Sequence, residues 1–591
     1  MEHIIKTAIA SSLIFGSVIS YGAVVQAQEP LSIVYPPPNH QTTAAQIFLI
    51  GTASPQGEVT VNGEEIRRSP AGHFAPSFPL ELGENTFQLR HNDEELIITV
   101  TRVDNNPTIP TEATFAENSL TPSVDITRLP GETICFSAVA PPSAEVSARL
   151  PGIFIPLLPE TQSINLPPNS EVLVGNNAPS NGIAEGLYRG CHQFNRVGNL
   201  GKPRFELDLQ GKRYSQTGEG EITIASPNNL EVVEVIEEGG IARTGASTNY
   251  SRLTPLPKGA IAQVTGKSGE WLRLDYGAWI KAKETRSLPT NTQTQSFIRS
   301  ITSRKLDNET EIIFPLQVAV PVSINQADDS ITLTLHNTTA QTDTILLNDD
   351  PIIKRLDWQQ TTPTEIAYTF QLKNDRQWGY SLRYEDTTLI FTLNHPPKIS
   401  TNSQLPLSGI EILLDPGHGG AEQGARGATG YPEKTINLII SQLLKSELNK
   451  LGATVYLTRE TDIDLSLKER IDIINEIKPD LAFSIHYNAL PDAGDAENTK
   501  GISTFWYHPQ AHDLAIFMQE YLITTLNRSD YGVFWNNLAL TRPAVAPTVL
   551  LELGFMINPW EFEWITDSKE QQKLAQAIAQ GIVEWIQKQN N

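Results

Sequence analysis

Four polar side chains in the last third of the chain stand where an apolar, strand-like segment ends or a helix begins. His418 comes after the segment IEILL, His486 follows LAFSI, and Glu552 follows TVLL. Glu433 follows Pro432, a residue type favoured in the first turn of a helix. Two imidazoles and one carboxylate form the ligand set of hydrolytic zinc sites, which keep a fourth position open. A second carboxylate nearby can take a proton from water and pass it to a leaving group.

The segment that joins two of these residues is rich in glycine. LLDPGHGGAEQGARGATGYPEK, residues 413–434, contains six glycines. Glycine adopts positive φ freely, so this segment can fold tightly enough for His418 and Glu433 to approach one ion. We therefore predict His418, Glu433 and His486 as zinc ligands and Glu552 as the general acid and base. The apolar neighbours of Glu552 should raise the pKa of its carboxyl group.

Each of these residues alone would be weak evidence for a catalytic site. A lone histidine after a strand is more often a hydrogen-bonded core or loop residue, and a glutamate at a helix start usually complements the helix dipole. Four such residues in one α/β unit are harder to explain by structure alone. The sequence has no G-x-S-x-G or H-E-x-x-H motif, so these other hydrolytic signatures do not compete. The ligand set also accepts other divalent ions.

Strand-like and helical segments alternate around these residues. The order is GIEILLD, TINLIISQLLKSELNKLG, TVYLTRE, LSLKERIDIINEI, DLAFSIHYNA and finally TVLLELGF. This alternation predicts βαβ units, and so an α/β domain with a mostly parallel sheet flanked by helices. The carboxyl ends of parallel strands meet at one edge of the sheet, where sites are built. The four residues should therefore converge there.

Five motifs in this region carry a resemblance to a known family. LLDPGHGG, YPEK, LTRETD, SIHYNA and LLELGFMIN resemble, in order and spacing, the zinc-dependent N-acetylmuramoyl-L-alanine amidases of the AmiC/LytC type. The resemblance covers about residues 409–591. It implies hydrolysis of the amide between the lactyl group of N-acetylmuramic acid and L-alanine of the stem peptide, with the same ligands and the same Glu552. Asn488 matches a family position and is a candidate for binding substrate or orienting His486.

Two other functions remain open at this point. A zinc peptidase could use the same chemistry on the stem peptide, and a wall-binding scaffold protein could carry an inert last domain.

Some division-associated family members insert a helix that covers the zinc between the second histidine and the final glutamate. Here His486 and Glu552 are 66 positions apart, which leaves room for one helix in AHDLAIFMQEYLITTLN and none for a blocking one. We expect a site that needs no obligatory activator protein.

Three β-rich units are predicted upstream. Residues 31–103, with GEVTVNGEEI, resemble an immunoglobulin-like sandwich. Residues 125–288 are β-rich and end, from about 230, in a segment similar to a bacterial SH3-like barrel through RLTPLPKG, Trp271 and Trp279. Residues 297–397, with WGYSLRYEDTTLIFTL, resemble the β-rich N-terminal (AMIN-like) domain of amidases. Such units serve as passive spacers or as wall-binding modules.

The N-terminus and the composition point to an exported protein. Residues 1–27 resemble a secretory signal peptide, with a retained membrane anchor as the alternative, and no later stretch is long and apolar enough to span a membrane. We expect the periplasm or the cell wall as the location.

The net charge of −23 argues against a nucleic-acid partner, and peptidoglycan is the expected partner. Cys135 and Cys191 could form a disulfide there, or be two separate buried thiols.

Overall fold

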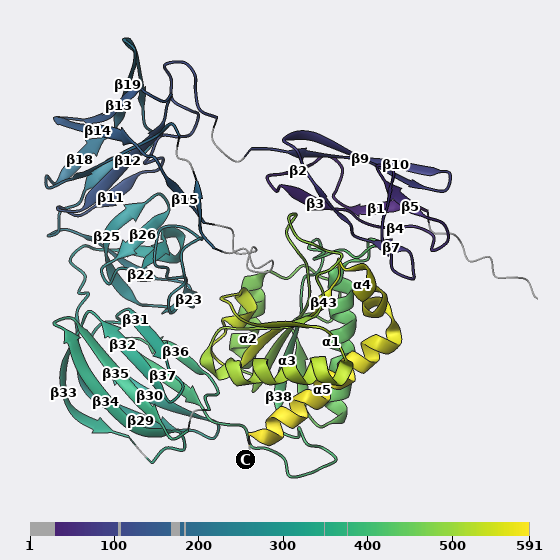
Figure 1. Ribbon diagram of the computed structural model, residues 1–591. Helices are drawn as coiled ribbons and strands as arrows, with labels where there is room; N and C mark the ends of the chain where they lie inside the picture. The colour runs from purple at the N-terminus through teal and green to yellow at the C-terminus, as the bar shows by residue number, and fades with distance from the viewer. Residues whose placement is uncertain are drawn as a thin grey trace, which may run out of the picture.

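The computed structural model describes residues 30–104, 108–166, 178–182, 185–347, 349–374 and 376–589. β-rich units occupy the first two thirds of the chain, and helices α1 to α5 belong to the C-terminal domain (Figure 1). This arrangement confirms the predicted multidomain architecture with an α/β domain at its end. The signal peptide predicted for residues 1–27 lies outside the described residues. None of the described helices is long and apolar enough to cross a membrane.

The N-terminal β-unit, residues 32–102, is built from three small sheets around one apolar core. The sheets have the strand orders β1-β4-β7, β2-β10-β9-β5-β6 and β3-β8. The strands are β1 (Ser32–Tyr35), β2 (His40–Thr42), β3 (Gln46–Phe48), β4 (Ile50–Thr52), β5 (Val59–Val61), β6 (Glu64–Glu65), β7 (His73–Phe74), β8 (Ser77–Pro79), β9 (Gly83–His91) and β10 (Glu94–Arg102). The immunoglobulin-like assignment of this unit stays a prediction.

Residues 126–288 contain a six-stranded and an eight-stranded sheet. The former has the order β12-β17-β14-β13-β19-β20, and the latter joins β18, β21 and β11 to the strands of the predicted SH3-like segment. Cys135 and Cys191 lie opposite each other on β12 and β17 and form a disulfide, which settles the two alternatives. The strands are β11 (Ile126–Arg128), β12 (Thr133–Val139), β13 (Glu145–Leu150), β14 (Ile153–Pro159), β15 (Ser163–Asn165), β16 (Ser180–Gly182), β17 (Leu187–Gln193), β18 (Gly198–Gly201), β19 (Arg204–Leu209), β20 (Lys212–Thr217), β21 (Ile222–Ile224), β22 (Glu231–Val235), β23 (Gly239–Gly240), β24 (Leu256–Pro257), β25 (Ile261–Ser268), β26 (Trp271–Leu274), β27 (Trp279–Lys281) and β28 (Thr285–Leu288).

Two sheets enclose a separate apolar core in residues 296–394. Their orders are β33-β29-β30-β37-β36 and β31-β32-β35-β34. On β32, Ile331, Leu333 and Leu335 alternate with half-buried polar residues, as their period-2 pattern predicts. The strands are β29 (Ser296–Lys305), β30 (Glu309–Pro315), β31 (Val322–Gln326), β32 (Ser330–His336), β33 (Thr338–Leu346), β34 (Ile353–Thr362), β35 (Glu365–Leu372), β36 (Tyr380–Glu385) and β37 (Thr388–Asn394). The SH3-like and AMIN-like assignments also stay predictions.

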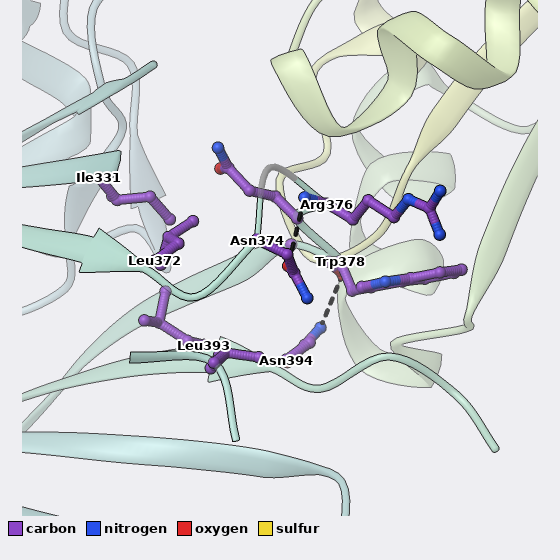
Figure 2. Close-up of a pocket in the computed structure, with 10 residues that line it drawn as sticks. Ile331, Leu372, Asn374, Arg376, Trp378, Leu393 and Asn394 are labelled. Atoms are coloured by element: carbon purple, nitrogen blue, oxygen red, sulfur yellow. Dashed lines mark hydrogen bonds between the residues drawn. The ribbon is translucent and has the colours of Figure 1, made fainter. Parts of the chain in front are cut away.

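This third unit is joined firmly to the C-terminal domain. The backbone N–H of Tyr380 donates to the carbonyl of Ala544 at 2.7 Å, and the indole rings of Trp378 and Trp585 lie 5.7 Å apart. Figure 2 shows a cavity at this junction, beside Trp378 and Asn394. Its volume is about 10 Å³, which admits one water molecule at most. The cavity is therefore a packing feature of the junction.

The C-terminal domain is a six-stranded sheet with the order β39-β38-β40-β43-β41-β42. All neighbouring pairs are parallel except β41 and β43, which are antiparallel, so the sheet is mostly parallel as predicted. The strands are β38 (Glu411–Pro416), β39 (Thr454–Leu457), β40 (Leu481–Asn488), β41 (Ile502–Trp506), β42 (Asp530–Trp535) and β43 (Thr548–Phe555), and the helices are α1 (Glu433–Lys450), α2 (Leu467–Ile477), α3 (His512–Leu526), α4 (Pro559–Thr566) and α5 (Ser568–Lys588).

Helix α1 covers one face of this sheet because its apolar residues repeat at helical spacing. Ile436, Ile440, Leu444 and Leu448 are buried in the main core of the domain. Helix α2 begins with a capping box in which Ser466 and Glu469 satisfy each other's backbone N–H groups, and it buries Ile474 in a smaller core with Leu413. These two helices thus cover opposite faces of the sheet.

Residues 489–547 separate β40 from β43, and every one of them is described. They contain one α-helix, α3, which buries Leu514, Met518 and Leu522 in the main core. This segment therefore holds no second α-helix, as the sequence predicted.

Candidate metal centre

The fold brings together the four residues that the sequence singled out. His418 lies in the loop after β38, and Glu433 is the first residue of α1. His486 and Glu552 lie on the neighbouring parallel strands β40 and β43, directly paired in register. Both strands run further than the sequence predicted, so these two residues lie within the strands instead of just after them. All four nevertheless gather at the carboxyl edge of the sheet.

Two histidines contact the same carboxylate. The Nε2 atom of His418 lies 3.2 Å from Oε2 of Glu433, and Nδ1 of His486 lies 3.1 Å from Oε1 of Glu433. One ligand atom from each of the three residues lies within 4.8 Å of the others, and the two imidazole rings are nearly perpendicular, with an interplanar angle of 79°. The distances and the donor types therefore fit one divalent ion of the zinc class.

The electrostatics keep Glu433 in the ionised form that a metal ligand needs. Burial alone would raise the pKa of Glu433, but hydrogen bonds from His418 and His486 outweigh burial and hold that pKa below its ordinary value. Burial lowers the pKa of His418, while the Glu433 carboxylate outweighs this effect and raises it. Glu433 is thus held as a carboxylate facing two imidazoles.

Two glycines allow the close approach of the ligands. A Cβ atom on Gly417 would lie 2.2 Å from Cε1 of His486, and one on Gly424 would lie 2.4 Å from Oε2 of Glu433. Gly424 also has a φ of +68°, and His418 itself has a φ of +58°, which a non-glycine residue rarely adopts. Such conformations cluster at functional sites. The glycine-rich segment therefore folds tightly around the ligands, as predicted.

The carbonyl groups of this loop are held by two buried arginines. Arg459 donates to the carbonyls of Pro416 and Gly417, and Arg470 donates to those of Pro416 and His418. The guanidinium groups point at backbone oxygens, so their role is to hold the loop in place.

Glu552 differs from Glu433 in having no partner for one oxygen. Its Oε2 atom is buried and accepts no hydrogen bond from the described residues. Burial, together with the charge of Glu433, raises the pKa of Glu552 well above its ordinary value. A carboxyl group in this state can exchange a proton with a reacting molecule.

Comparison with known proteins identifies the domain that carries this centre. Residues 412–584 match the family model described as N-acetylmuramoyl-L-alanine amidase (Amidase_3). This part of the chain belongs to that amidase family. All four residues of the centre lie inside the matched range, in what is called the amidase domain below.

Relatives of the amidase domain include curated proteins and solved structures. The probable cell wall amidase LytH of Staphylococcus aureus is 37% identical over 185 residues, which are 31% of this chain and 60% of LytH. The chain thus spans about 60% of the length of these curated relatives. The catalytic domain of CwlV, an N-acetylmuramoyl-L-alanine amidase from Bacillus (Paenibacillus) polymyxa var. colistinus, is 30% identical, with coverage of 30% of this chain and 98% of that one and a TM-score of 0.29. The Clostridioides difficile CwlD amidase, solved in complex with the GerS lipoprotein, has the same identity, coverage and TM-score.

Asn488 of the amidase domain has a free hydrogen-bond donor. Its side-chain oxygen accepts from the backbone N–H of Ala489 at 2.9 Å, whereas its buried Nδ2 atom has no partner among the described residues. No contact with the imidazole of His486 is present in this described region. A substrate-binding role for Asn488 therefore stays a prediction, and an orienting role has no support from its contacts.

The sequence reasoning missed one residue of the centre. The Nδ2 atom of Asn437 donates to Oε1 of Glu433 at 3.0 Å, and Asn437 is fully buried on α1. Residues four positions apart on a helix are neighbours, so the spacing from Glu433 could have indicated this contact. Asn437 thus fixes the orientation of the central carboxylate.

Proposed function

We propose that this protein is an exported zinc-dependent peptidoglycan amidase. It hydrolyses the amide between the lactyl group of N-acetylmuramic acid and the L-alanine of the stem peptide. The observation that carries this proposal is the convergence of His418, Glu433 and His486 within 4.8 Å, with Glu552 paired opposite His486. The membership of residues 412–584 in the amidase family supports the choice of bond.

Each residue has a separate task in this reaction. His418, Glu433 and His486 would hold the zinc ion, which when bound would supply Lewis-acid polarisation of the amide carbonyl and a lowered pKa for the attacking water. Glu552 takes the proton of that water and then delivers it to the leaving nitrogen. Asn488 has a buried Nδ2 donor without a partner among the described residues, and we assign this donor to a substrate carbonyl. The three loop carbonyls bound by Arg459 and Arg470 keep His418 in position.

We further propose that the protein acts in the periplasm or the cell wall and needs no activator protein. The single helix between β40 and β43 packs in the core, which supports an uncovered centre. CwlD was solved with a lipoprotein partner, so a requirement for such a partner is the natural alternative. Zinc-loaded full-length protein should cleave purified peptidoglycan without additions, and activity that appears only with a second protein would exclude this part of the proposal.

The decisive experiment combines metal analysis with mass spectrometry of digested muropeptides. Wild-type protein should bind one zinc ion and release free stem peptides that begin with L-alanine. Cleavage inside the stem peptide would instead identify a peptidase, and zinc-loaded protein without hydrolysis would identify a wall-binding scaffold. His418→Ala should lose zinc and activity together, whereas Glu552→Gln should retain zinc and lose hydrolysis by several orders of magnitude. Unchanged turnover in Glu552→Gln would remove that residue from its proposed role.

A further inference from the structure

The N-terminal β-unit is attached to the amidase domain close to the metal centre. The Asp492 carboxylate, in the loop after β40, accepts a hydrogen bond from the Tyr35 hydroxyl and lies 2.9 Å from Nε2 of His40. Arg67 forms an ion pair with Glu497 at 2.8 Å and stacks over the ring of Trp560 at 5.1 Å. Two units that are more than 400 residues apart along the chain are therefore joined by specific contacts, and they lie together near β43 and α4 (Figure 1).

Apolar packing reinforces this attachment. Phe48, Ile50 and Ala75 of the β-unit are almost fully buried and belong to the main core of the amidase domain. The rings of His73 and Phe562 lie 5.2 Å apart in an edge contact. Shared burial of this kind makes the β-unit a fixed part of the amidase domain's surface.

A pocket lies between the two units, beside the glycine-rich loop that follows His418. Its volume is about 260 Å³, and its walls are mostly apolar. Val34 and Tyr35 line it from the β-unit, while Gly424, Leu490 and Ile557 line it from the amidase domain. Gly424 packs directly against Glu433 and His418, so a molecule in this pocket would lie beside the metal ligands.

One charged side chain lines this apolar pocket. Arg426, two residues after Gly424, is exposed, and its guanidinium has no hydrogen bond or ion pair with the described residues. The Tyr35 hydroxyl is the polar group that lines the pocket from the β-unit, and it already donates a hydrogen bond to the Asp492 carboxylate. An exposed, unpaired arginine beside mostly apolar walls fits a carboxylate carried by a chain with small apolar side chains.

We propose that the N-terminal β-unit and the amidase domain together form a subsite for an acidic peptide with small apolar side chains. This inference rests on the proposed function, since it assigns the subsite to the peptide side of the hydrolysed amide. Val34 lines the subsite from the β-unit and Leu490 lines it from the amidase domain, and Arg426 binds a peptide carboxylate. The β-unit is then a determinant of substrate specificity in addition to any role in wall attachment. The cavity in Figure 2 is no rival site because of its small size.

Paired substrates test the role of Arg426 in the zinc-loaded full-length protein. Soluble muramoyl peptides are prepared with free carboxylates and with the same carboxylates amidated. The wild type should hydrolyse the acidic form with a kcat/KM about tenfold higher, mainly through a lower KM. Arg426→Gln should reduce the ratio of kcat/KM on the acidic form to kcat/KM on the amidated form to about one. Arg299→Gln, which removes an exposed arginine on β29, should keep the wild-type ratio.

A second pair of variants tests the wall from the β-unit. Val34→Trp fills the pocket and should raise KM for muramoyl peptides at least fivefold, whereas Ile97→Trp, at an exposed position on β10, should have no effect. Asp492→Ala removes the anchor of Tyr35 and His40 from the amidase side and should also raise KM. Bound zinc and the melting temperature report whether each variant is folded.

The outcomes separate the subsite from the function itself. Hydrolysis by the wild type with equal rates on acidic and amidated peptides, or with KM unchanged in both Val34→Trp and Asp492→Ala, overturns the subsite and leaves the amidase proposal standing. Absence of hydrolysis by the wild type on any muramoyl peptide overturns both.

Discussion

The carboxylate of Asp415 and the guanidinium of Arg470 form an ion pair at 2.6 Å, with side chains that are only 1% and 2% exposed. The hydroxyls of Thr458 and Ser484 also donate to Asp415, at 2.6 and 2.7 Å. Arg470 in turn holds the carbonyl of His418. This pair therefore links β38, β40, the residue after β39 and α2 to the loop that presents the first predicted metal ligand.

Asp415→Asn should destabilise the amidase domain by about 3–5 kcal/mol, because it leaves the Arg470 charge buried without a partner. Urea unfolding followed by tryptophan fluorescence measures the change. Asp472→Asn removes an exposed carboxylate from the same helix as Arg470 and should change the stability by less than about 0.5 kcal/mol. Equal stability of the two variants would show that the buried pair contributes nothing.

The same pair predicts how stability depends on pH. Burial alone would raise the pKa of Asp415, but Arg470 and the two hydroxyls outweigh burial and lower it below its ordinary value of 3.8. Since the folded pKa lies below the unfolded one, this stabilisation is complete above about pH 4 and is lost as the pH falls further. The difference in unfolding free energy between wild type and Asp415→Asn should therefore be constant from pH 5 to 7 and shrink below pH 4. A difference that does not vary with pH would contradict the assignment.

Asn437→Ala should weaken zinc binding about 10–100-fold, because Glu433 loses the hydrogen bond that orients one of its oxygens. Competition with a chelating dye measures the zinc affinity. Gln442→Ala changes an exposed amide on the same helix and should bind zinc like the wild type. If the affinity of Asn437→Ala stays within twofold of wild type, the orientation of Glu433 does not depend on this contact.

Local sequence patterns predicted most of the amidase domain. The spacing of Ile436, Ile440 and Leu444 indicated the buried face of α1, and the polar residues near strand ends indicated the metal centre. These features follow from periodicity and from chain order, both of which a single sequence displays. The register of β40 and β43 then placed His486 opposite Glu552, which strand order alone does not specify.

Contacts between distant segments could not be predicted in this way. Nothing in the sequence around Tyr35 or Asp492 marks them as partners, because their pairing depends on how two separately folded units meet. The antiparallel pairing of β41 with β43 is a similar case, since the long segment between β40 and β43 permits either direction. The subsite wall supplied by the β-unit therefore became visible only in the structure.

Reduction of the disulfide should destabilise the unit that contains it without affecting catalysis. Cys135 and Cys191 are 56 positions apart, and closing a loop of this length contributes roughly 4 kcal/mol in the chain-entropy model. Urea unfolding with and without reductant measures this effect. The double variant Cys135→Ala/Cys191→Ala should not respond to reductant, and hydrolysis under native conditions should stay within twofold of wild type. A reductant-independent unfolding midpoint for the wild type would contradict the prediction.

Removal of zinc should lower the thermal stability of the amidase domain. An ion that binds only the folded state stabilises it by about 4 kcal/mol at a free concentration 1,000 times its Kd. For a domain of this size, such a change corresponds to a shift of roughly 8–16 °C, measurable by calorimetry of the full chain with zinc and with chelator. His486→Ala should lose this shift, because only two ligands remain. Glu552→Gln should keep it, since Glu552 is proposed to move protons without holding the ion. If Glu552→Gln lost the shift as completely as His486→Ala, Glu552 would have to be reassigned as a ligand.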